Sequence, residues 1–218
     1  MDILLDFHGR PSSPRAALAF IAACAPPNPI LVEEPIQPDD HVAMAKIAEQ
    51  AGCPIATGER LVTHREFEEL CGLRAITYVQ PDLCHCGGFT VGKQIAATAA
   101  TFGVGVCPHN PMGPIAGVVG LHFGAAVPNF VILEETTGSV PWYEEVVQTP
   151  IRRVDGYCEL PTAPGLGCRG QRKDRGRASF PAEGDRLARR CHQPRRHRCE
   201  LVAADDADLT TDVGTLRP

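Results

Sequence analysis

Short apolar runs that end at an acidic residue recur along this chain. Ile30–Val32 leads into Glu33, and Pro54–Thr57 is followed, after one glycine, by Glu59. Between these runs, Asp40 is of a type that caps helix N-termini, and the apolar residues after it have helical spacing. A helix that connects two strands in this way predicts parallel strands whose carboxyl ends meet at one edge of a sheet.

The same strand-ending feature repeats at intervals of 23 to 27 residues. In chain order, the strand-ending residues are Asp6, Glu33, Glu59, Asp82, His109 and Glu134. An interval of this length fits one strand, one helix and two short loops. Six consecutive βα units with a functional type of residue at each strand end predict an α/β fold of the (β/α) TIM-barrel type. An open doubly wound sheet is the alternative, but it would gather its ligand groups at one switch point.

Local signals predict the helices between these strands. Thr63 and Glu66 have the spacing of a capping box, Thr90 is expected to cap a further helix, and Pro14 suits a first helical turn. Besides the helix after Asp40, the expected helices are Pro14–Ala25, a segment from Thr63 to Gly72, Val91–Phe102 and Ile115–Ala126.

The strand count predicts an incomplete barrel. About eight strands close a barrel of this type, but only six are found between Asp6 and Glu134. We therefore expect residues 1–168 to form a partial barrel of about six βα units that lacks the first two strands. Val140–Gly167 is expected to fold back across it. The open edges beside Asp6 and Glu134 would be prone to aggregation.

Charge and composition change abruptly at Cys168. Residues 1–168 carry 9 Lys and Arg against 18 Asp and Glu, whereas residues 169–218 carry 12 against 8. The acidic body argues against a nucleic-acid surface and suits divalent cations. The Arg-rich tail, 169–218, has no apolar periodicity, so we expect it to be disordered. It is either sequence from a shifted reading frame, which the abrupt change favours, or a nucleic-acid-binding segment.

Neither export signals nor metal-finger motifs are found. The first ten residues lack a basic segment, and no stretch is long enough to span a bilayer, which predicts a cytoplasmic protein without a membrane partner. The ten cysteines have no paired spacing and are typical of small apolar core residues. Cys84-His85-Cys86 could bind a soft metal, but ligands one residue apart in a strand face opposite ways.

Three of the strand-ending acids, Asp6, Glu33 and Glu59, are expected to hold a metal ion. Like charges gathered within a few ångströms destabilise one another unless a cation neutralises them. Ligation by oxygen alone selects a hard ion, and Mg²⁺ is the one we predict. Each acid taken singly could instead be a solvated rim charge or a helix cap. The metal is favoured because all three acids stand at the same position, at the carboxyl ends of successive strands.

Two histidines are candidates for proton transfer. Asp82 lies on the strand beside His109 and would fix its tautomer and raise its basicity. His8 lies two residues after Asp6, so both side chains face the same way, and the imidazole could deliver a proton to a leaving oxygen. Glu134 could bind a carboxylate oxygen if protonated, or orient a hydroxyl. His109 could instead be a loop histidine held by a backbone carbonyl.

These motifs together resemble a known family over residues 1 to about 167. The matching segments are Asp6, Glu33-Glu34-Pro35, Gly58-Glu59-Arg60, Pro81-Asp82-Leu83 with Gly87-Gly88, His109 and Glu134. They resemble the enolase superfamily, in its mandelate racemase/muconate lactonizing enzyme subgroup, whose chemistry uses a Lys or His base with Mg²⁺. Within it, Asp6–Arg10 and His109–Pro114 are similar to the galactonate dehydratase-like acid-sugar dehydratases.

The resemblance implies a lyase reaction on a small-molecule sugar acid, an aldonate such as galactonate. The substrate would bind Mg²⁺ through its carboxylate and 2-hydroxyl, and His109, oriented by Asp82, would remove the α-proton to give a metal-stabilised enediolate. His8 would protonate the departing 3-hydroxyl, which leaves a 2-keto-3-deoxy acid. Arg60, His85 and Glu34 would contact the substrate or support residues that do, although each could equally be a rim residue in an ordinary salt bridge.

Compared with this family, we expect residues 1–168 to lack the N-terminal capping domain and the first two barrel strands. Because the second of those strands often bears a base in racemases, a racemase or cycloisomerase is an alternative to the dehydratase. An inactive barrel fragment whose basic tail contacts nucleic acid is another. Full-length relatives are expected to be homo-oligomers.

Overall fold

Five short parallel strands alternate with five α-helices in the computed structural model, which describes residues 2–136 and 143–170. The strands pair in chain order, β1-β2-β3-β4-β5, and every pair is parallel. The elements are β1 (Leu4–Asp6), α1 (Pro14–Cys24), β2 (Leu31–Glu33), α2 (His41–Gln50), β3 (Ile55–Thr57), α3 (His64–Gly72), β4 (Tyr78–Val79), α4 (Gly88–Thr101), β5 (Gly105–Val106) and α5 (Pro114–Ala126).

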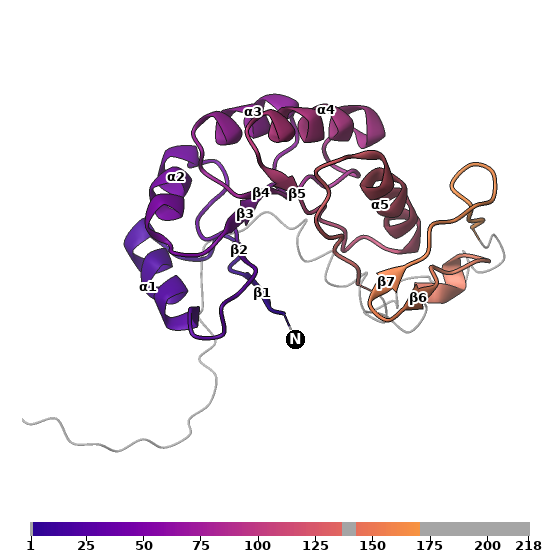
Figure 1. Ribbon diagram of the computed structural model, residues 1–218, viewed down its shortest axis with the longest axis horizontal. Coiled ribbons are helices and arrows are strands. Elements are labelled where there is room, and N and C mark those ends of the chain that lie inside the picture. Colours follow the sequence, from indigo (N-terminus) through magenta and orange to yellow (C-terminus); the bar gives the residue numbers. More distant parts are fainter. Residues whose placement is uncertain (1, 137–142, 171–218) are drawn as a thin grey trace, which may run out of the picture. The chain divides into compact units, whose positions relative to one another are not determined.

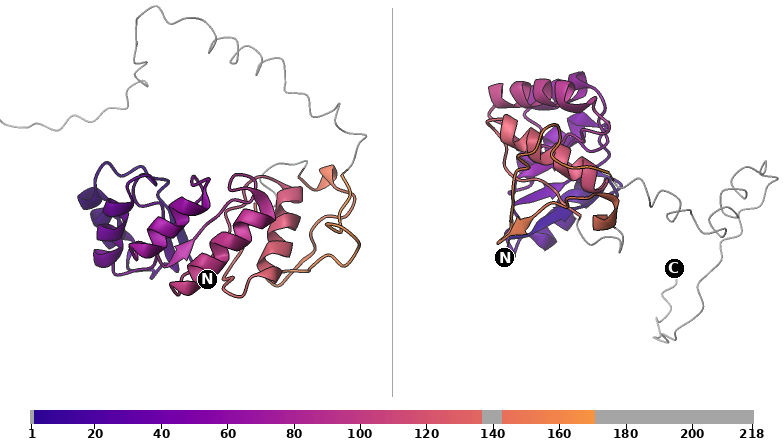
Figure 2. Two further views of the ribbon diagram at one scale, coloured as in Figure 1. Left: turned by 90° about the horizontal axis from the view of Figure 1, so that it is seen from above. Right: turned by 90° about the vertical axis from the view of Figure 1, so that its right-hand side faces the viewer.

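Helices α1 to α5 all cover the outer face of the curved sheet (Figure 1). Seen from above, they follow one another along that face in chain order (Figure 2), and each contacts the next. A strand, a helix on one fixed face and a neighbouring parallel strand form the repeating unit of a (β/α) barrel. The predicted α/β fold is therefore confirmed, and all five strands point their carboxyl ends to the same rim.

The main core lies between the sheet and these helices. Strand residues Val32, Ile55, Val79 and Val106 are at most 1% exposed and belong to the same cluster as residues from the helices. The helix residues at its centre are Ile21, Met44, Ile47, Phe67, Leu70 and Ile95. On the inner face, a smaller cluster joins Leu31, Ala56 and Cys107 with Tyr78. Side chains therefore alternate between the two faces, which leaves the inner face at the rim for polar residues.

Most helix starts follow from the capping residues in the sequence. The Asp40 side chain accepts a hydrogen bond from the Ala43 backbone at 2.9 Å, and α2 begins at the next residue. Thr63 and Glu66 form the expected capping box at the start of α3. The prediction for Thr90 was wrong, because α4 already begins at Gly88. Its N-cap is Gly87, which has a φ of 106° that favours glycine.

The predicted sixth strand is reduced to a single bridge. Val106 donates to Asn129 O at 2.8 Å, and Val131 donates back to Val106 O at 2.9 Å, so Phe130 pairs with Val106 in parallel. The next donor in this ladder would be residue 108, which is a proline without an N–H group. The regular ladder is interrupted there, and a single further bond, from Glu134 N–H to Pro108 O at 3.3 Å, holds the segment beside β5 without making it a regular strand.

Residues 143–170 pack at the end of this sheet. They include a 3₁₀ helix, η1 (Tyr143–Val146), which contacts α5, and a hairpin of β6 (Arg153–Val154) and β7 (Tyr157–Cys158). Glu135 holds this region, because its carboxylate accepts from Tyr143 Oη at 2.7 Å and lies 2.9 Å from Arg153 Nη2. The predicted tail lies outside the described residues apart from Arg169 and Gly170, so its disorder and the boundary at 168 stay predictions.

None of the described helices combines the length and the apolar character that crossing a membrane requires.

The capping box at α3 gives a stability prediction. The Glu66 carboxylate accepts from the backbone N–H groups of Thr63 at 2.8 Å and Val62 at 3.2 Å. We expect Glu66→Ala to lower the free energy of unfolding by about 1 kcal/mol in urea denaturation. Glu68→Ala, an exposed site on the same helix, is the matched control and should change it by much less.

The same pair of variants has a defined pH dependence. Burial acts to raise the pKa of Glu66, but hydrogen bonds from Thr63 and Val62 outweigh it and hold the pKa below its ordinary value. A carboxyl with a depressed pKa stabilises the fold above its unfolded-state pKa, and this contribution is lost as the pH falls through the folded-state pKa. The difference between wild type and Glu66→Ala should therefore shrink in acid; a difference independent of pH would contradict the assignment.

Candidate active site at the strand ends

The parallel register places the first two predicted acids side by side. Asp6 at the end of β1 is the partner of Glu33 at the end of β2, and residues paired in this way face the same side of a sheet. Glu59 follows the end of β3 by two residues. Gly58 makes that turn possible, since it has a φ of 147° and a Cβ there would lie 2.8 Å from Gln80 N. All three acids thus reach the same rim from successive strands.

The carboxylate of Glu59 lies between two histidines. His8 Nδ1 is 2.8 Å from Glu59 Oε1, and His109 Nε2 is 2.8 Å from Glu59 Oε2. Glu59 is 5% exposed, whereas the side chain of His8 is half exposed and that of His109 is 12% exposed. The structure therefore brings together three of the residues that the sequence singled out, from the first, third and fifth βα units.

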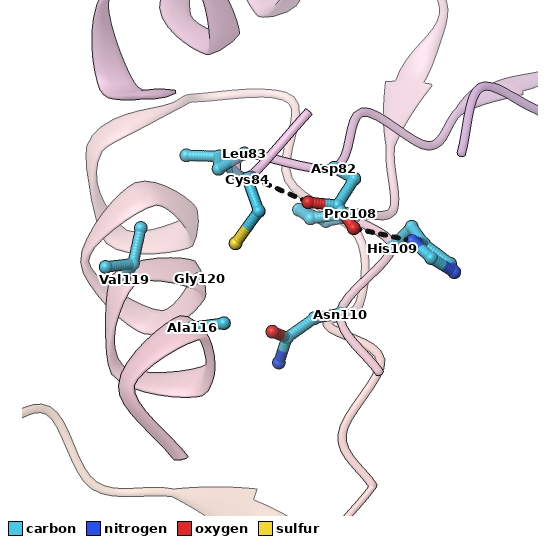
Figure 3. A pocket seen from close by; sticks show the side chains of 9 residues that line it. All are labelled: Asp82, Leu83, Cys84, Pro108, His109, Asn110, Ala116, Val119 and Gly120. Carbon is cyan, nitrogen blue, oxygen red and sulfur yellow. Dashed lines mark hydrogen bonds and ion pairs between the residues drawn. The ribbon is translucent and has the colours of Figure 1, made fainter. Parts of the chain in front are cut away.

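His109 and Asp82 form the predicted pair (Figure 3). His109 Nδ1 lies 2.9 Å from Asp82 Oδ2, and the Cys84 backbone donates to Asp82 Oδ1 at 2.6 Å, so both carboxylate oxygens are fixed. This bond occupies Nδ1 and leaves Nε2 as the atom that can exchange a proton on the open side. The expected orientation of the imidazole by the carboxylate is present, and no backbone carbonyl takes its place.

The two members of this pair shift each other's pKa in opposite directions. Burial acts to raise the pKa of Asp82, but the hydrogen bonds with His109 and Cys84 outweigh it and lower that pKa below its ordinary value. Burial acts to lower the pKa of His109, but the hydrogen bond with Asp82 and the charges of Glu134 and Glu59 outweigh it and raise that pKa. Asp82 thus remains a carboxylate while His109 is a stronger base than a free imidazole.

His8 lies beside Asp6, as the two-residue spacing predicted. The His8 backbone N–H donates to Asp6 Oδ1 at 2.6 Å, and His8 Nδ1 lies 3.7 Å from Asp6 Oδ2. His8 has a φ of 50°, in the left-handed region that few non-glycine residues adopt. A local conformation of this kind is retained where the surroundings impose it, and such positions cluster at functional sites.

The pKa of Glu33 shows how the acids at the rim act on one another. Burial raises its pKa to about 7, and although the Gln80 side chain lowers it by hydrogen bonding, the charges of Asp6, Glu59 and Glu134 raise it further. The pKa of Glu59 is also raised, first by burial and then by the charge of Glu34. Carboxyl groups that share a rim under these conditions suit a hard divalent cation, which would relieve both effects.

The predicted metal ligands are nevertheless not drawn into one cluster. In the part of the chain that the structure describes, the one group of three or more metal-ligating side chains within 4.8 Å of one another is His8, Glu34 and Glu59. Asp6 and Glu33 are outside it, because Glu59 is directed to the two histidines. Among the cysteines that the structure describes, Cys71, Cys86 and Cys107 are buried, as expected of core residues, whereas Cys84 is exposed.

Glu34 and Arg60 are engaged with each other. Glu34 is completely buried, and Arg60 Nη2 and Nε lie 2.6 and 2.8 Å from Glu34 Oε2. His85 is more accessible, with a side chain 39% exposed and Nδ1 3.2 Å from Glu59 O. The Glu34 carboxylate is therefore occupied by Arg60, whereas the His85 side chain is partly accessible.

Three residues that the sequence interpretation did not predict as site residues also hold the groups at the rim in place. Asn110 is 4% exposed; its backbone donates to Glu134 Oε2 at 2.8 Å and its amide to Glu134 O at 3.0 Å, which fixes Glu134 at the rim. Gln80 bonds Glu33, and Gln37 bonds Gly9 and Arg60. Asn110 follows His109 directly, which was the one available signal; the two glutamines carried none.

A small cavity lies behind the His109–Asp82 pair (Figure 3). It is lined by Asp82, Leu83, Cys84, Pro108, His109, Asn110, Ala116, Val119 and Gly120 and has a volume of about 10 Å³. This space suits a single water molecule. The other ring nitrogen of His109, Nε2, faces away from this cavity and toward Glu59.

The fold is that of a known protein family. Residues 1–173 match the family described as enolase C-terminal domain-like, and the chain belongs to this family. The α/β sheet of parallel strands thus belongs to the TIM-type barrel of the enolase superfamily, as the residue motifs indicated.

The curated relatives point to one type of enzyme. The chain is 35% identical over 170 residues to the D-galactonate dehydratase of Ralstonia nicotianae. The aligned segment covers 75% of this chain and 44% of the relative. It is 39% identical over 134 residues to the D-galactonate dehydratase of Cronobacter sakazakii. This second alignment covers 62% of the chain and 35% of the relative. The chain thus spans less than half the length of these relatives.

Solved structures show the same fold. An enolase from Agrobacterium radiobacter, solved with Na and L-malate bound, superposes with a TM-score of 0.75 at 36% identity, over 79% of this chain and 47% of that one. A mandelate racemase/muconate lactonizing enzyme from Jannaschia sp. CCS1 superposes with a TM-score of 0.73 at 32% identity, over 90% and 46%.

The Asp82–His109 pair gives a prediction for NMR. Asp82→Asn removes the charge and the accepting carboxylate behind the imidazole, so the pKa of His109 should fall. A ¹H–¹³C titration of the histidine ring signals without added metal measures this, with the His109 signals assigned from a His109→Gln spectrum. Asp155→Asn, the same change in the exposed β6–β7 turn, is the control. An unchanged pKa of His109 in Asp82→Asn would rule out the coupling.

Proposed function

We propose that this chain carries the catalytic rim of a Mg²⁺-dependent acid-sugar dehydratase, a hydro-lyase that converts an aldonate such as galactonate into a 2-keto-3-deoxy acid. The observation that carries this proposal is the placement of two histidines on either side of Glu59, one of them backed by Asp82. Dehydration requires one group to remove a proton from carbon and another to give a proton to the leaving oxygen, and this rim offers both. The relatives named D-galactonate dehydratase support the substrate class.

His109 is the proposed base. Asp82 occupies Nδ1, so Nε2 accepts the proton when the C2–H bond of the substrate breaks. The raised pKa of His109 increases its basicity, and Asp82, which stays ionised, stabilises the imidazolium that forms. The backbone N–H of Cys84 keeps Asp82 fixed. The cavity behind the pair, at about 10 Å³, is too small for a substrate.

His8 is the proposed acid. When the C3–O bond breaks, His8 gives a proton to the leaving hydroxyl and water departs. The enol that remains then takes a proton at C3 and becomes the 2-keto acid. His8 suits this role because its side chain is half exposed and lies across Glu59 from His109. A proton donor and a proton acceptor thus approach the substrate from different strands.

Asp6, Glu33 and Glu59 would hold the Mg²⁺ ion. The pKa of Glu33, raised to about 7 by burial and by the neighbouring acids, supports a cation there. When bound, the ion would supply Lewis-acid stabilisation of the negative charge that develops on the substrate carboxylate. Glu134, held by Asn110, would orient a polar group of the substrate, and Arg60, His85 and Glu34 would contact the substrate or support those contacts.

Because the chain spans less than half of its relatives' length, the substrate, the assembly into homo-oligomers and the cytoplasmic location all remain proposals. A racemase or cycloisomerase is the competing function, since a structural neighbour carries that name. Both reactions begin with removal of an α-proton. They differ in whether a hydroxyl then leaves.

The test is to run the reaction in D₂O with Mg²⁺ and a panel of aldonates. Wild type should give a 2-keto-3-deoxy acid with deuterium at C3, detected by ¹H NMR. His109→Asn should abolish product formation and C2 exchange together. His8→Asn should retain C2 exchange in recovered substrate while dehydration falls by about 100-fold or more, since the base remains and the acid is lost.

His64→Asn is the control, because His64 lies on α3 and bonds Thr98 away from the rim; it should behave as wild type. A product epimerised at C2 with its hydroxyl retained would establish the racemase reading instead. Absence of any metal-dependent keto acid from the panel would overturn the dehydratase proposal.

A further inference from the structure

The turn after β1 that carries His8 has an unusual backbone. His8 and Gly9 have φ values of 50° and 63°, so two consecutive residues are left-handed. The Gly9 N–H donates to Glu34 O at 2.8 Å, which fastens the turn to the end of β2. An extended or right-handed conformation at His8 would be intrinsically favoured, so contacts from outside the turn must hold it.

One of those contacts comes from a side chain that no proposed role has yet used. Gln37 Nε2 donates to Gly9 O at 2.7 Å, across 28 residues of sequence. Its other amide atom, Oε1, accepts from Arg60 Nη1 at 3.2 Å. The amide therefore connects the turn after β1 to the turn after β3, and both of its polar ends are occupied.

Arg60 makes this connection rigid. Its guanidinium is held by the completely buried carboxylate of Glu34, at distances of 2.6 to 3.1 Å. Gly9 is buried beneath it, and a Cβ there would lie 2.3 Å from Arg60 Nη2 and 3.1 Å from Gln37 Nε2. The chain of contacts thus runs from a buried carboxylate through a guanidinium and an amide to the carbonyl next to His8.

We propose that Gln37 is a positioning residue for His8, and that Arg60 acts through it and not mainly on the substrate. The donor group of Gln37 holds Gly9 in its left-handed conformation and so keeps the His8 imidazole against Glu59. This inference rests on the proposed role of His8 in dehydration. Gln37 should therefore affect the delivery of a proton by His8 and not the removal of a proton by the base, His109.

The decisive variant is Gln37→Glu. It keeps the size of the side chain and its acceptor for Arg60 but removes the N–H donor to Gly9 O. Gln37→Ala removes both contacts. Gln50→Glu makes the same chemical change at an exposed helix position, where the amide bonds Lys46 O of its own helix, and serves as the matched control.

Hydrogen–deuterium exchange of the amides in residues 8–10 measures the effect without any need for turnover. Loss of one hydrogen bond should make these amides exchange about three- to tenfold faster in Gln37→Glu and Gln37→Ala. Exchange in the rest of the chain, and in Gln50→Glu throughout, should match wild type. Unchanged exchange at residues 8–10, or acceleration spread over the whole chain, would overturn the proposal.

Turnover in D₂O separates this inference from the proposed function. If wild type forms the keto acid, Gln37→Glu should lower kcat for dehydration by about tenfold with little change in KM or in C2 exchange; equal losses of dehydration and C2 exchange would contradict a role confined to His8. If wild type forms no keto acid while the local exchange still rises, the proposed function fails and the positioning of His8 by Gln37 stands.

Discussion

The crowding of carboxylates around Glu59 is the constraint on which the rest of this site depends. Glu59 is nearly buried, lies among other acids, and has an imidazole nitrogen 2.8 Å from each of its oxygens. Burial raises the pKa of neighbouring Glu33 to about 7. A fold gathers such groups at a cost in stability, and it is therefore reasonable that they serve chemistry and not folding.

The architecture produces this crowding through strand register and a few special backbone positions. Parallel pairing brings Asp6 and Glu33 side by side, and Gly58 permits the close turn that places Glu59 next to them. Pro108 interrupts the ladder after β5, and Glu134 is held both by its backbone N–H, which donates to Pro108 O at 3.3 Å, and by Asn110. The proposed catalytic residues His8, Asp82 and His109 thus stand on short loops directly after the packed strands β1, β4 and β5, which is the arrangement typical of barrel enzymes.

Much of this could be predicted from the sequence because the relevant signals are local. Asp40 and the Thr63–Glu66 box mark helix starts by chemistry that acts within one turn. The period of 23 to 27 residues identified His109 and Asp82 as neighbours without coordinates. The prediction that Thr90 caps a helix was wrong. Thr90 is a good capping residue, but the two left-handed glycines at 87 and 88 start the helix earlier.

Other features depend on distances that no local pattern encodes. Gln37 and Gly9 are 28 residues apart, and an amide gives no periodic signal of its partner. The direction in which the Glu59 carboxylate points could not be predicted from the sequence either. The sequence predicted that it joins Asp6 and Glu33, whereas it faces the two histidines, because the pairing of an acid with imidazoles is decided by side-chain geometry at the rim.

The central claim is that these acids form a site for one hard divalent cation, and direct metal binding tests it. Electron paramagnetic resonance of Mn²⁺, used in place of Mg²⁺, counts free and bound ion in the same titration. The account predicts a single saturable site in wild type whose affinity falls at least about tenfold in Glu33→Gln, since one charged ligand is lost. No saturable site in wild type, or equal affinity in both proteins, would contradict it.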